Sequence, residues 1–300
     1  MGDQDREVMS SGYDPPILAV RQAVALALAE DLLPLGDATA KLVPGDRSAQ
    51  LHIVAREDGI VAGGLCAAES FRQVDSSIAV DWRIPDGGRI TRGSVVAEVA
   101  GPLRSILTAE RTALNFLCHL SGVATLTDRF VAVVSRASQV TAVLDTRKTT
   151  PGLRALEKAA VRAGGGRNHR GNLSEAVLVK DNHLVGSSIA EAVASARELW
   201  PFKLVEVECD TMEQAIKAQD AGATMVLLDN MTPDEVAACV VALRSRAGGK
   251  RVLVEVSGGV TLETAPLYAA AGTDFISVGA LTHSSPAVDL GLDIPVASAG

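Results

Sequence analysis

Short apolar runs alternate with longer amphipathic stretches along the second half of the chain. Six runs have the length of a buried strand, and the segments between them have helical spacing. The predicted strands lie at residues 140–144, 176–179, 204–207, 225–228, 252–256 and 275–278. Nearly continuous apolar strands that alternate with helices indicate a parallel sheet covered by helices on its outer face.

Start and stop signals bracket the helices of this alternating region. Capping boxes, in which a Ser or Thr precedes a Glu or Gln by three residues, open at Ser188, Thr211 and Thr232. Pro233 fits a first helical position, where its missing N–H loses no hydrogen bond. Gly222 and Gly272 fit the C-terminal ends of two helices. These signals place the helix boundaries independently of the strands.

The first half of the chain has a different pattern. Residues 17–33 carry apolar side chains at helical spacing. Short strand candidates follow at residues 51–55, 59–63, 78–82 and 94–100, with a helix at 65–74. Residues 103–134 have the spacing of a long amphipathic helix, interrupted near Ser121-Gly122, where we place the domain boundary. We therefore predict an α+β unit with its own sheet, preceded by a mobile N-terminus at residues 1–14.

Polar or glycine-rich residues follow every strand of the alternating region. They are Asp145-Thr-Arg-Lys148, Lys180-Asp-Asn-His183, Glu208, Asp229-Asn230, Ser257-Gly-Gly259 and Gly279-Ala280. In a closed β/α barrel the C-terminal ends of the strands meet on one rim, where active sites lie. An open doubly wound sheet would bring several of them together at a switch point. Six units without a Gly-x-Gly-x-x-Gly motif after the first strand favour the barrel.

Composition narrows the function classes. The 300-residue chain is 47% hydrophobic and has a net charge of −8, which argues against non-specific binding to nucleic acid or to a membrane surface. Its four cysteines form no Cys-x-x-Cys pair, so we expect neither zinc ligation nor a redox pair. The acidic N-terminus lacks the pattern of a signal peptide, and no run approaches the ~18–20 apolar residues of a membrane span. We expect a cytoplasmic protein.

Basic residues gather at the predicted rim of this acidic protein. They are Arg147, Lys148, His169, Arg170 and Lys180. Cations at strand ends are costly to desolvate, and the planar fork of arginine matches carboxylates and phosphates. The group therefore predicts a site for a polyanion, although ordinary surface charge would explain a single Arg-Lys pair. Lys180 could instead form a Schiff base, as in barrel aldolases.

Two acids and a set of small residues complete the predicted rim. Glu208 and Asp229 would hold Mg²⁺ or ribose hydroxyls near a phosphate-rich ligand, or would serve only as a cap or an ion-pair partner. Glycines let the backbone approach an anion closely, which predicts a phosphate cup. Its residues are Ser257, Gly258, Gly259, Gly279 and Ala280. A phosphorylated sugar with Mg²⁺ and a separate small polyacid would fill this rim.

Several long motifs, in the same order, resemble those of the quinolinate phosphoribosyltransferase family. They are Glu30-Asp31, Gly36-Asp-Ala-Thr39, Thr108-Ala-Glu-Arg-Thr-Ala-Leu-Asn115, Asp145-Thr-Arg-Lys-Thr-Thr-Pro-Gly-Leu-Arg154, Gly164-Gly-Gly-Arg-Asn-His-Arg170, Lys180-Asp-Asn-His183, Leu228-Asp-Asn230, Glu255-Val-Ser-Gly-Gly259 and Gly279-Ala-Leu-Thr-His283. The resemblance covers about residues 15–293. Ala159 departs from it, because many members of the family have Tyr there, and so does Gly171-Asn172, which replaces a more apolar pair.

The resemblance implies a fold, an assembly and an activity. The fold is an N-terminal α/β sandwich domain at residues 15–121, which segment 286–300 joins, and an incomplete (open) β/α barrel at residues 122–285. The assembly is a homodimer in which Arg111 enters the neighbouring subunit's site. The activity is transfer of phosphoribosyl from phosphoribosyl pyrophosphate to quinolinate, with Mg²⁺ as cofactor. Loss of CO2 gives nicotinate mononucleotide and pyrophosphate in NAD biosynthesis.

The resemblance also implies roles for individual residues. Those expected to bind quinolinate are Arg111, Thr146, Arg147, His169, Arg170 and Lys180. Those expected to bind phosphoribosyl pyrophosphate are Lys148, Lys180, Glu208, Asp229, Ser257, Gly258, Gly259, Gly279 and Ala280. Lys148, Glu208 and Asp229 are the expected catalytic residues, and the two acids are expected to bind Mg²⁺ directly or indirectly.

Three alternatives to this activity stay open from the sequence. A sister branch of the family, linked to molybdenum uptake, shares the fold and parts of the motifs. An aldolase would use Lys180 as a Schiff base. A catalytically silent paralogue would bind a dicarboxylate and release no pyrophosphate. The intact basic group together with both acids favours the transferase.

Overall fold

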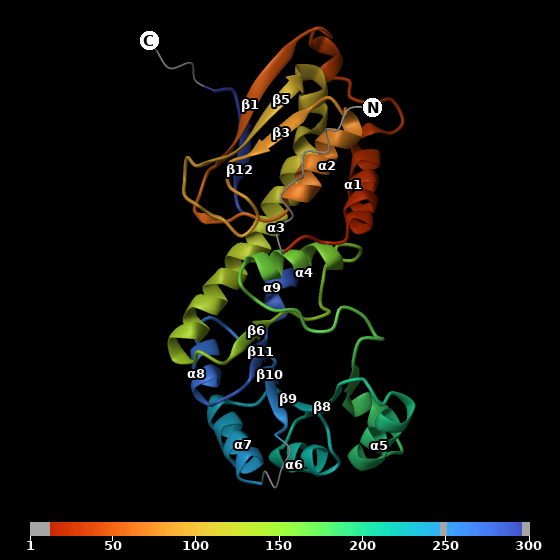
Figure 1. The fold of residues 1–300 in the computed structure, drawn as a ribbon, viewed down its shortest axis with the longest axis vertical. Coiled ribbons are helices and arrows are strands. Elements are labelled where there is room, and N and C mark those ends of the chain that lie inside the picture. The colour runs from red at the N-terminus through yellow and green to blue at the C-terminus, as the bar shows by residue number, and fades with distance from the viewer. Residues whose placement is uncertain (1–12, 247–250, 296–300) are drawn as a thin grey trace. The chain divides into compact units, whose positions relative to one another are not determined.

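The computed structural model describes residues 13–246 and 251–295, which fold into two compact units (Figure 1). The first unit comprises the described parts of Met1–Leu126, Thr149–Gly165 and Leu281–Gly300, and the second comprises those of Thr127–Lys148 and Gly166–Ala280. The chain therefore passes between the units more than once. Of the N-terminus expected to be mobile, residues 1–14, all but Tyr13 and Asp14 lie outside the described residues.

The first unit is built on an antiparallel sheet with the strand order β12-β1-β5-β3. Its strands are β1 (Ser48–Ala55), β3 (Ala79–Trp82), β5 (Val95–Pro102) and β12 (Leu290–Asp293). A separate ribbon pairs β2 (Gly59–Ile60) with β4 (Arg89–Ile90). The helices are α1 (Ile17–Leu32), α2 (Gly64–Val74), α4 (Arg154–Ala163) and the start of α3 (Leu103–Ala137), with a short 3-10 helix at Ala40–Leu42. The sequence predicted this sheet but not β4 or β12.

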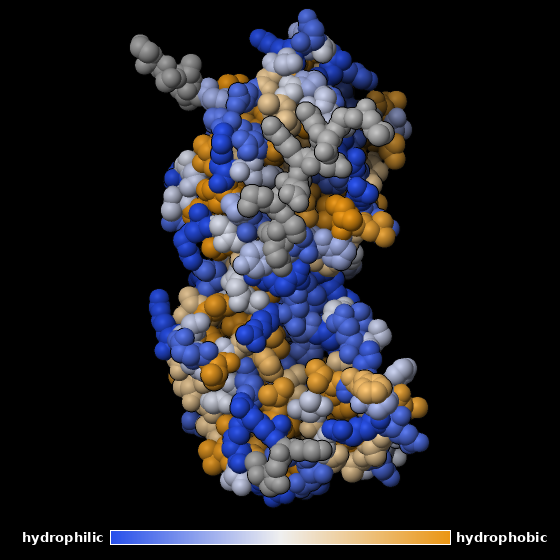
Figure 2. All heavy atoms as spheres, in the orientation of Figure 1, coloured by the Kyte–Doolittle hydropathy of each residue, from blue (hydrophilic) through white to orange (hydrophobic). Residues whose placement is uncertain are grey.

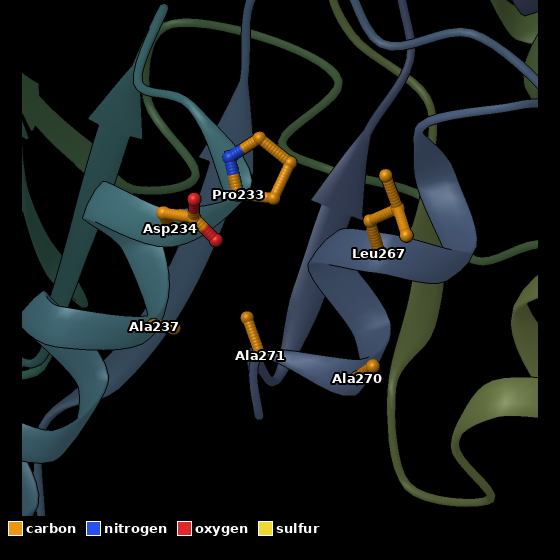
Figure 3. A pocket seen from close by; sticks show the side chains of 6 residues that line it. All are labelled: Pro233, Asp234, Ala237, Leu267, Ala270 and Ala271. Carbon is orange, nitrogen blue, oxygen red and sulfur yellow. The ribbon is translucent and has the colours of Figure 1, made fainter.

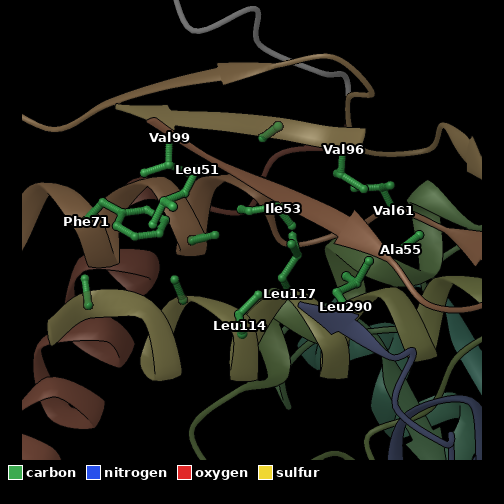
Figure 4. Close-up of a cluster of buried hydrophobic side chains, with 14 of the residues drawn as sticks. Leu51, Ile53, Ala55, Val61, Phe71, Val96, Val99, Leu114, Leu117 and Leu290 are labelled. Carbon is green, nitrogen blue, oxygen red and sulfur yellow. The ribbon is translucent and has the colours of Figure 1, made fainter. Parts of the chain in front are cut away.

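The core of the first unit lies between the sheet and the helices α2 and α3 (Figure 4). Ile53 of β1, Val99 of β5 and Leu117 of α3 are fully buried, and Phe71 of α2 is only 1% exposed. Buried positions alternate along the second half of β1, as expected for a strand with one face in the core. Leu290 of β12 joins the same cluster, so a C-terminal strand completes the core of the first unit.

The interruption expected near Ser121-Gly122 is wrong, because α3 runs without a break over 35 residues. Gly122 instead allows a close contact. A Cβ atom at this position would lie 2.1 Å from the carbonyl oxygen of Pro286 and 3.0 Å from Cα of Ala287. The chain that leads into β12 therefore packs directly on the helix backbone at this glycine.

In the part of the chain that the structure describes, α3 is also the one helix long and apolar enough to cross a membrane by length and composition. Its most apolar stretch has a mean hydropathy of 1.3, and half of that stretch is buried in the structure. Core helices pass the same test, and the buried face of α3 is typical of one.

The second unit is a parallel sheet of six strands. Its strands are β6 (Ala142–Leu144), β7 (Val177–Val179), β8 (Val205–Cys209), β9 (Met225–Asp229), β10 (Leu253–Ser257) and β11 (Phe275–Ser277). The helices are α5 (Ile189–Leu199), α6 (Met212–Asp220), α7 (Pro233–Ser245) and α8 (Ala265–Ala270), with a 3-10 helix at Asp181–Leu184. The short helix α9 (Ala280–His283) begins at the last residue of this unit and continues into the first. All six strands predicted from the apolar runs are present.

The strand order β6-β11-β10-β9-β8-β7 makes this sheet an incomplete barrel. The first strand, β6, pairs with the last, β11, which is the pairing that curls a sheet towards closure. The consecutive strands β6 and β7 do not pair, so they form the two edges of the sheet. The predicted fold class, a small α/β domain followed by an open barrel of parallel strands, is confirmed.

The predicted helix signals are also confirmed. In all three capping boxes the Ser or Thr side chain accepts the backbone N–H three residues on, and the Glu or Gln reaches back. Pro233 occupies the first turn of α7. Gly222 and Gly272 follow their helices with φ of +88° and +90°. Local capping chemistry therefore sets where these helices begin and end.

Candidate active site

Asp145 follows β6 directly and is fully buried. Its carboxylate accepts hydrogen bonds from the backbone N–H of His169 at 2.8 Å and from Nδ2 of Asn168 at 2.6 Å. A buried carboxylate is stable only with such donors. Asp145 therefore fixes the segment that carries two residues of the predicted basic group, His169 and Arg170.

This segment lies at the open side of the sheet. Arg167 donates its N–H to the carbonyl of Val143 at 2.8 Å and accepts the N–H of Asp145 at 3.2 Å, so the segment runs beside the edge strand β6. Arg170 donates from Nη1 to the carbonyl of Ala176 at 3.2 Å, directly before the other edge strand, β7. The basic segment thus bridges the opening in the barrel.

The guanidinium groups of Arg147 and Arg170 repel each other here. Burial first, and then the positive charge of Arg147, lower the pKa of Arg170, and the Glu206 carboxylate opposes this shift. Like charges held near one another favour the binding of an anion, and arginine forks match carboxylates. Arg147 and Arg170 therefore support the predicted anion site.

His169 is largely buried between two carboxylates. Its Nε2 atom lies 3.1 Å from Oε2 of Glu206 and 3.4 Å from Oε2 of Glu255. These glutamates come from β8 and β10, and the side chain of each is only 1% exposed. Ser277 of β11 donates its hydroxyl to Glu255. We call these four residues the acid–histidine cluster.

The acid–histidine cluster holds its protons tightly. Burial lowers the pKa of His169, but the hydrogen bonds and charges of Glu206 and Glu255 outweigh it and raise that pKa to about 10. Burial and the charge of Glu255 raise the pKa of Glu206 to about 7. On the other side of the ring, Nδ1 lies 2.8 Å from the N–H of Arg170, which favours a neutral ring instead. Whether the ring is charged or neutral, Nε2 keeps its proton and faces the two carboxylates.

The ligand atoms of His169, Glu206 and Glu255 lie within 4.8 Å of one another, a spacing that could hold a metal ion. A metal would need the lone pair of Nε2. Because Nδ1 faces the N–H of Arg170, Nε2 is the nitrogen that carries the proton. Proton sharing within the cluster fits this geometry better than metal ligation.

The two predicted acids lie at the C-terminal ends of β8 and β9. Glu208 forms an ion pair with the ammonium group of Lys180. Asp229 accepts a hydrogen bond from Nδ2 of Asn230 at 2.6 Å. A Schiff-base mechanism needs Lys180 as a free amine, whereas here its ammonium group is paired. Carboxylate oxygens at neighbouring strand ends are donors that suit Mg²⁺.

The predicted phosphate cup begins beside Asp229. Ser257 is its register partner at the end of β10. The carbonyl of Ser257 accepts the N–H of Asn230 at 3.0 Å. Gly258 has a φ of +94°, and a Cβ atom there would lie 2.2 Å from Oδ1 of Asn230. Only glycine fits this turn, because it needs both a positive φ and the close approach.

The structure places most of the predicted site residues at the C-terminal ends of the parallel strands. Those at or directly after the C-terminal end of a strand are Thr146, Arg147, Lys148, Lys180, Glu208, Asp229, Ser257, Gly258, Gly259, Gly279 and Ala280. His169 and Arg170 join them through Asp145. Arg111 belongs to the other unit, where it lies on α3 with an exposed side chain.

Sequence reasoning missed Glu206, Glu255 and Ser277 as site residues. The signal was in the strands: β8 reads Val-Glu-Val-Glu, and β10 contains Val-Glu-Val-Ser. Side chains two residues apart on a strand share a face. Glu206 therefore accompanies Glu208, and Glu255 accompanies Ser257. The apolar character of the strands as a whole hid this alternation.

A groove of about 430 Å³ lies between α7 and α8 in the outer helical layer (Figure 3). Pro233 and Ala237 line it from α7, and Leu267 and Ala270 line it from α8. Its walls are mostly apolar, and Asp234 is the one charged residue among those that line it. Without a basic side chain, the groove does not match the predicted anion site.

Comparison with known proteins identifies one family over nearly the whole chain. The profile described as "Quinolinate phosphoribosyl transferase, N-terminal domain" matches residues 37–121. The profile described as "Quinolinate phosphoribosyl transferase, C-terminal domain" matches residues 123–293. Both halves of the chain are therefore similar to the same kind of protein.

Individual relatives agree with these profiles. The chain is 41% identical to a nicotinate-nucleotide pyrophosphorylase (carboxylating) of Mycobacterium leprae, over 92% of this chain and 97% of that protein. It is 39% identical to the carboxylating enzyme of the same name from Rattus norvegicus, over 86% and 87% of the two chains. The solved structure of the nicotinate-nucleotide pyrophosphorylase from Francisella tularensis is 39% identical and has a TM-score of 0.87, and the similarity covers 95% of this chain and 99% of that one.

Proposed function

The chain belongs to the quinolinate phosphoribosyltransferase family, and from this premise we propose that it is a carboxylating nicotinate-nucleotide pyrophosphorylase. It transfers the phosphoribosyl group of phosphoribosyl pyrophosphate to quinolinate and releases pyrophosphate and CO2. The product, nicotinate mononucleotide, serves NAD biosynthesis. The names of the relatives favour this activity over a Schiff-base aldolase, a molybdenum-linked sister branch or a silent paralogue.

The two carboxylates of quinolinate bind the basic group at the strand ends. Arg147 and Arg170 supply guanidinium forks, and Thr146 and Lys180 follow the two edge strands, β6 and β7. The repulsion between the two guanidinium groups supports this role, since an anion bound between them would relieve it. His169 acts in the same place by holding the segment that ends in Arg170.

Phosphoribosyl pyrophosphate binds along the adjacent strand ends. Lys148 and Lys180 attract its phosphates, and the ribose lies near Glu208 and Asp229. Ser257, Gly258, Gly259, Gly279 and Ala280 form the cup for the 5′-phosphate. The oxygen donors of the two acids fit Mg²⁺, which supplies charge neutralisation for the pyrophosphate when it is bound.

The reaction has two steps. The pyridine nitrogen of quinolinate uses its lone pair to form a bond to C1 of the ribose, and the C1–O bond breaks as its electron pair leaves with pyrophosphate. Glu208 and Asp229 stabilise the positive charge that develops on the sugar. The cationic ring then loses its 2-carboxylate as CO2, and the electron pair left at C2, stabilised by the adjacent N⁺, takes a proton from solvent. The basic group contributes by holding the nitrogen next to C1.

The enzyme acts as a homodimer in which Arg111 completes the neighbouring subunit's quinolinate site. Arg111 is exposed on α3, as a residue that reaches a second chain must be. Exposed leucines around α1 provide apolar surface for association. Leu26, Leu33 and Leu35 are 68%, 73% and 83% exposed, and apolar side chains are visible over α1 in Figure 2.

The observation that carries this proposal is the match of both family profiles together with an intact basic group at the strand ends. The test is to incubate the protein with phosphoribosyl pyrophosphate, Mg²⁺ and either quinolinate or nicotinate. We expect pyrophosphate and CO2 in equal amounts with quinolinate. The assigned activity would be excluded if no pyrophosphate were released with either acid, or if it were released with nicotinate but not with quinolinate.

Replacing Arg147 by alanine should weaken quinolinate binding. Removal of one member of a bidentate charged pair costs roughly 2–5 kcal/mol, so the quinolinate KM should rise at least tenfold. Steady-state kinetics with each substrate varied in turn measures this change. Arg136→Ala, which removes an exposed arginine from the last turn of α3, is the matched control and should leave both KM values unchanged. Equal kinetics for Arg147→Ala and the wild type would remove Arg147 from the site.

A further inference from the structure

Asn230 has an unusual backbone conformation. Among residues 13–246 and 251–295 it is the one non-glycine residue with a positive φ, at 56°. This left-handed conformation is unfavourable for most side chains, and asparagine is one of the few residues that adopt it regularly. Strained backbone of this kind often occurs at functional sites. The contacts of its side chain decide whether Asn230 is more than a turn residue.

Those contacts reach both parts of the predicted phosphoribosyl site. Towards β9, Nδ2 of Asn230 donates to Oδ2 of Asp229 at 2.6 Å. Towards β10, its backbone N–H donates to the carbonyl of Ser257 at 3.0 Å. Asp229 and Ser257 are themselves register partners at the ends of these strands. Asn230 therefore connects an acid on one strand to the glycine turn on the next.

The glycine turn is shaped around this side chain. A Cβ atom on Gly258 would lie 2.2 Å from Oδ1 and 2.8 Å from the backbone nitrogen of Asn230. At Gly259, by contrast, a Cβ atom would meet nothing within 4 Å. The lack of a side chain at Gly258 thus creates the space that the Asn230 amide fills, and the two residues fix each other's position.

We propose that Asn230 is a positioning residue for phosphoribosyl pyrophosphate, which orients the Asp229 carboxylate and holds the Ser257–Gly258 turn in the shape that receives the phosphate. This inference rests on the proposed function, because it assigns Asp229 and the turn to that substrate. Asn230 does not itself contact the reacting atoms. Its amide keeps Asp229 from rotating, so the carboxylate is preorganised for the sugar side of the site.

The competing explanation is that asparagine occurs at position 230 only because it can adopt the positive φ of the turn, and that its side chain positions nothing. Glycine adopts a positive φ more easily than asparagine, so Asn230→Gly keeps the turn and the backbone N–H to Ser257 while it removes the amide. If Asn230 served the turn alone, this variant would bind as well as the wild type. Asn230→Asp keeps the size of the side chain but places a second carboxylate where the donor to Asp229 was.

The experiment measures phosphoribosyl pyrophosphate binding by calorimetry with Mg²⁺ and without quinolinate, so that no turnover occurs. We expect the Kd to rise about tenfold in Asn230→Gly, as for the loss of a hydrogen bond to a charged group, and further in Asn230→Asp. Quinolinate binding, measured separately, should change less than about twofold because its residues lie elsewhere on the sheet edge.

Thr232→Ala is the control in the same loop. It removes the N-cap hydroxyl of α7, which contacts Glu235, and should lower the unfolding temperature while leaving the Kd unchanged. A Kd in Asn230→Gly equal to that of the wild type would overturn this inference. Wild-type protein that binds no phosphoribosyl pyrophosphate would overturn the proposed function itself.

Discussion

Glu206 and Glu255 place two carboxylates in the interior of a parallel sheet, where apolar side chains are the rule. Burying a charge costs on the order of several kcal/mol unless a partner compensates it. His169 lies between the two glutamates, and Ser277 donates to one of them. Packing alone would not require buried carboxylates that cost this much free energy. Their place beside the basic group therefore indicates a functional site.

The acid–histidine cluster should make the stability of the protein depend on pH. In the folded protein the pKa of His169 is about 10 against 6.5 in the unfolded chain, and that of Glu206 is about 7 against 4.5. Both groups bind their proton more tightly when folded. Their contribution is therefore complete below the unfolded values and is lost as pH rises, through about 7 for Glu206 and about 10 for His169.

Urea unfolding near pH 6 and near pH 9 tests this expectation against a variant in which Glu206 and Glu255 are glutamine and His169 is asparagine. The unfolding free energy of the wild type relative to this variant should fall between the two pH values. A constant difference would contradict the raised pKa values of both His169 and Glu206.

At the scale of elements, local signals predicted the second unit well. Its strands are short apolar runs, and three of its helices begin with capping boxes. A few adjacent residues therefore determine where each of these elements begins. The first unit was harder, because β4 and β12 are short and depend on distant partners. Asp293 of β12 pairs with His52 of β1, and nothing near residue 293 announces a strand.

Gly122 shows how one residue led us to expect a break in α3 that is not there, and it offers a test. In an unobstructed helix, Gly→Ala stabilises by about 1 kcal/mol. Here the new Cβ would lie 2.1 Å from the carbonyl oxygen of Pro286, so Gly122→Ala should instead destabilise the protein by about 1–3 kcal/mol. Urea unfolding measures the difference, with Arg136→Ala on the same helix as the control. A more stable Gly122→Ala protein would contradict the packing of residues 286–287 on α3.

At the scale of the whole molecule, the sequence predicted which strand ends meet, because the order of parallel strands fixes it. Apart from segment 286–300, which the family resemblance assigned to the first domain, it could not predict how the chain passes between the two units. Residues 149–165 lie between two strands of the second unit but belong to the first, where Glu157 of α4 lies 2.9 Å from His119 of α3. Such contacts depend on segments far apart in the chain. The acid–histidine cluster was missed for a related reason, since its members come from different strands.

The proposed sharing of Arg111 between subunits predicts that two inactive variants can restore each other. Arg111→Ala and Arg147→Ala should each lose most activity. If the dimer is symmetric, random mixing makes half of the dimers hybrids, and each hybrid has one intact site of its two, so activity should return to about a quarter of the wild type. Co-expression with two affinity tags allows the hybrid to be purified, and the purified hybrid should have about half of the wild-type activity.

A second pair of variants separates sharing from simple stabilisation. Arg147→Ala and Lys180→Ala both remove groups from the strand ends of the second unit, so a hybrid of these two has no intact site and should stay inactive. If Arg111 instead served its own subunit, the Arg111→Ala and Arg147→Ala hybrid would stay inactive as well. Recovery in the first pair and none in the second therefore requires that Arg111 act across the interface, because only then does one subunit supply what the other has lost.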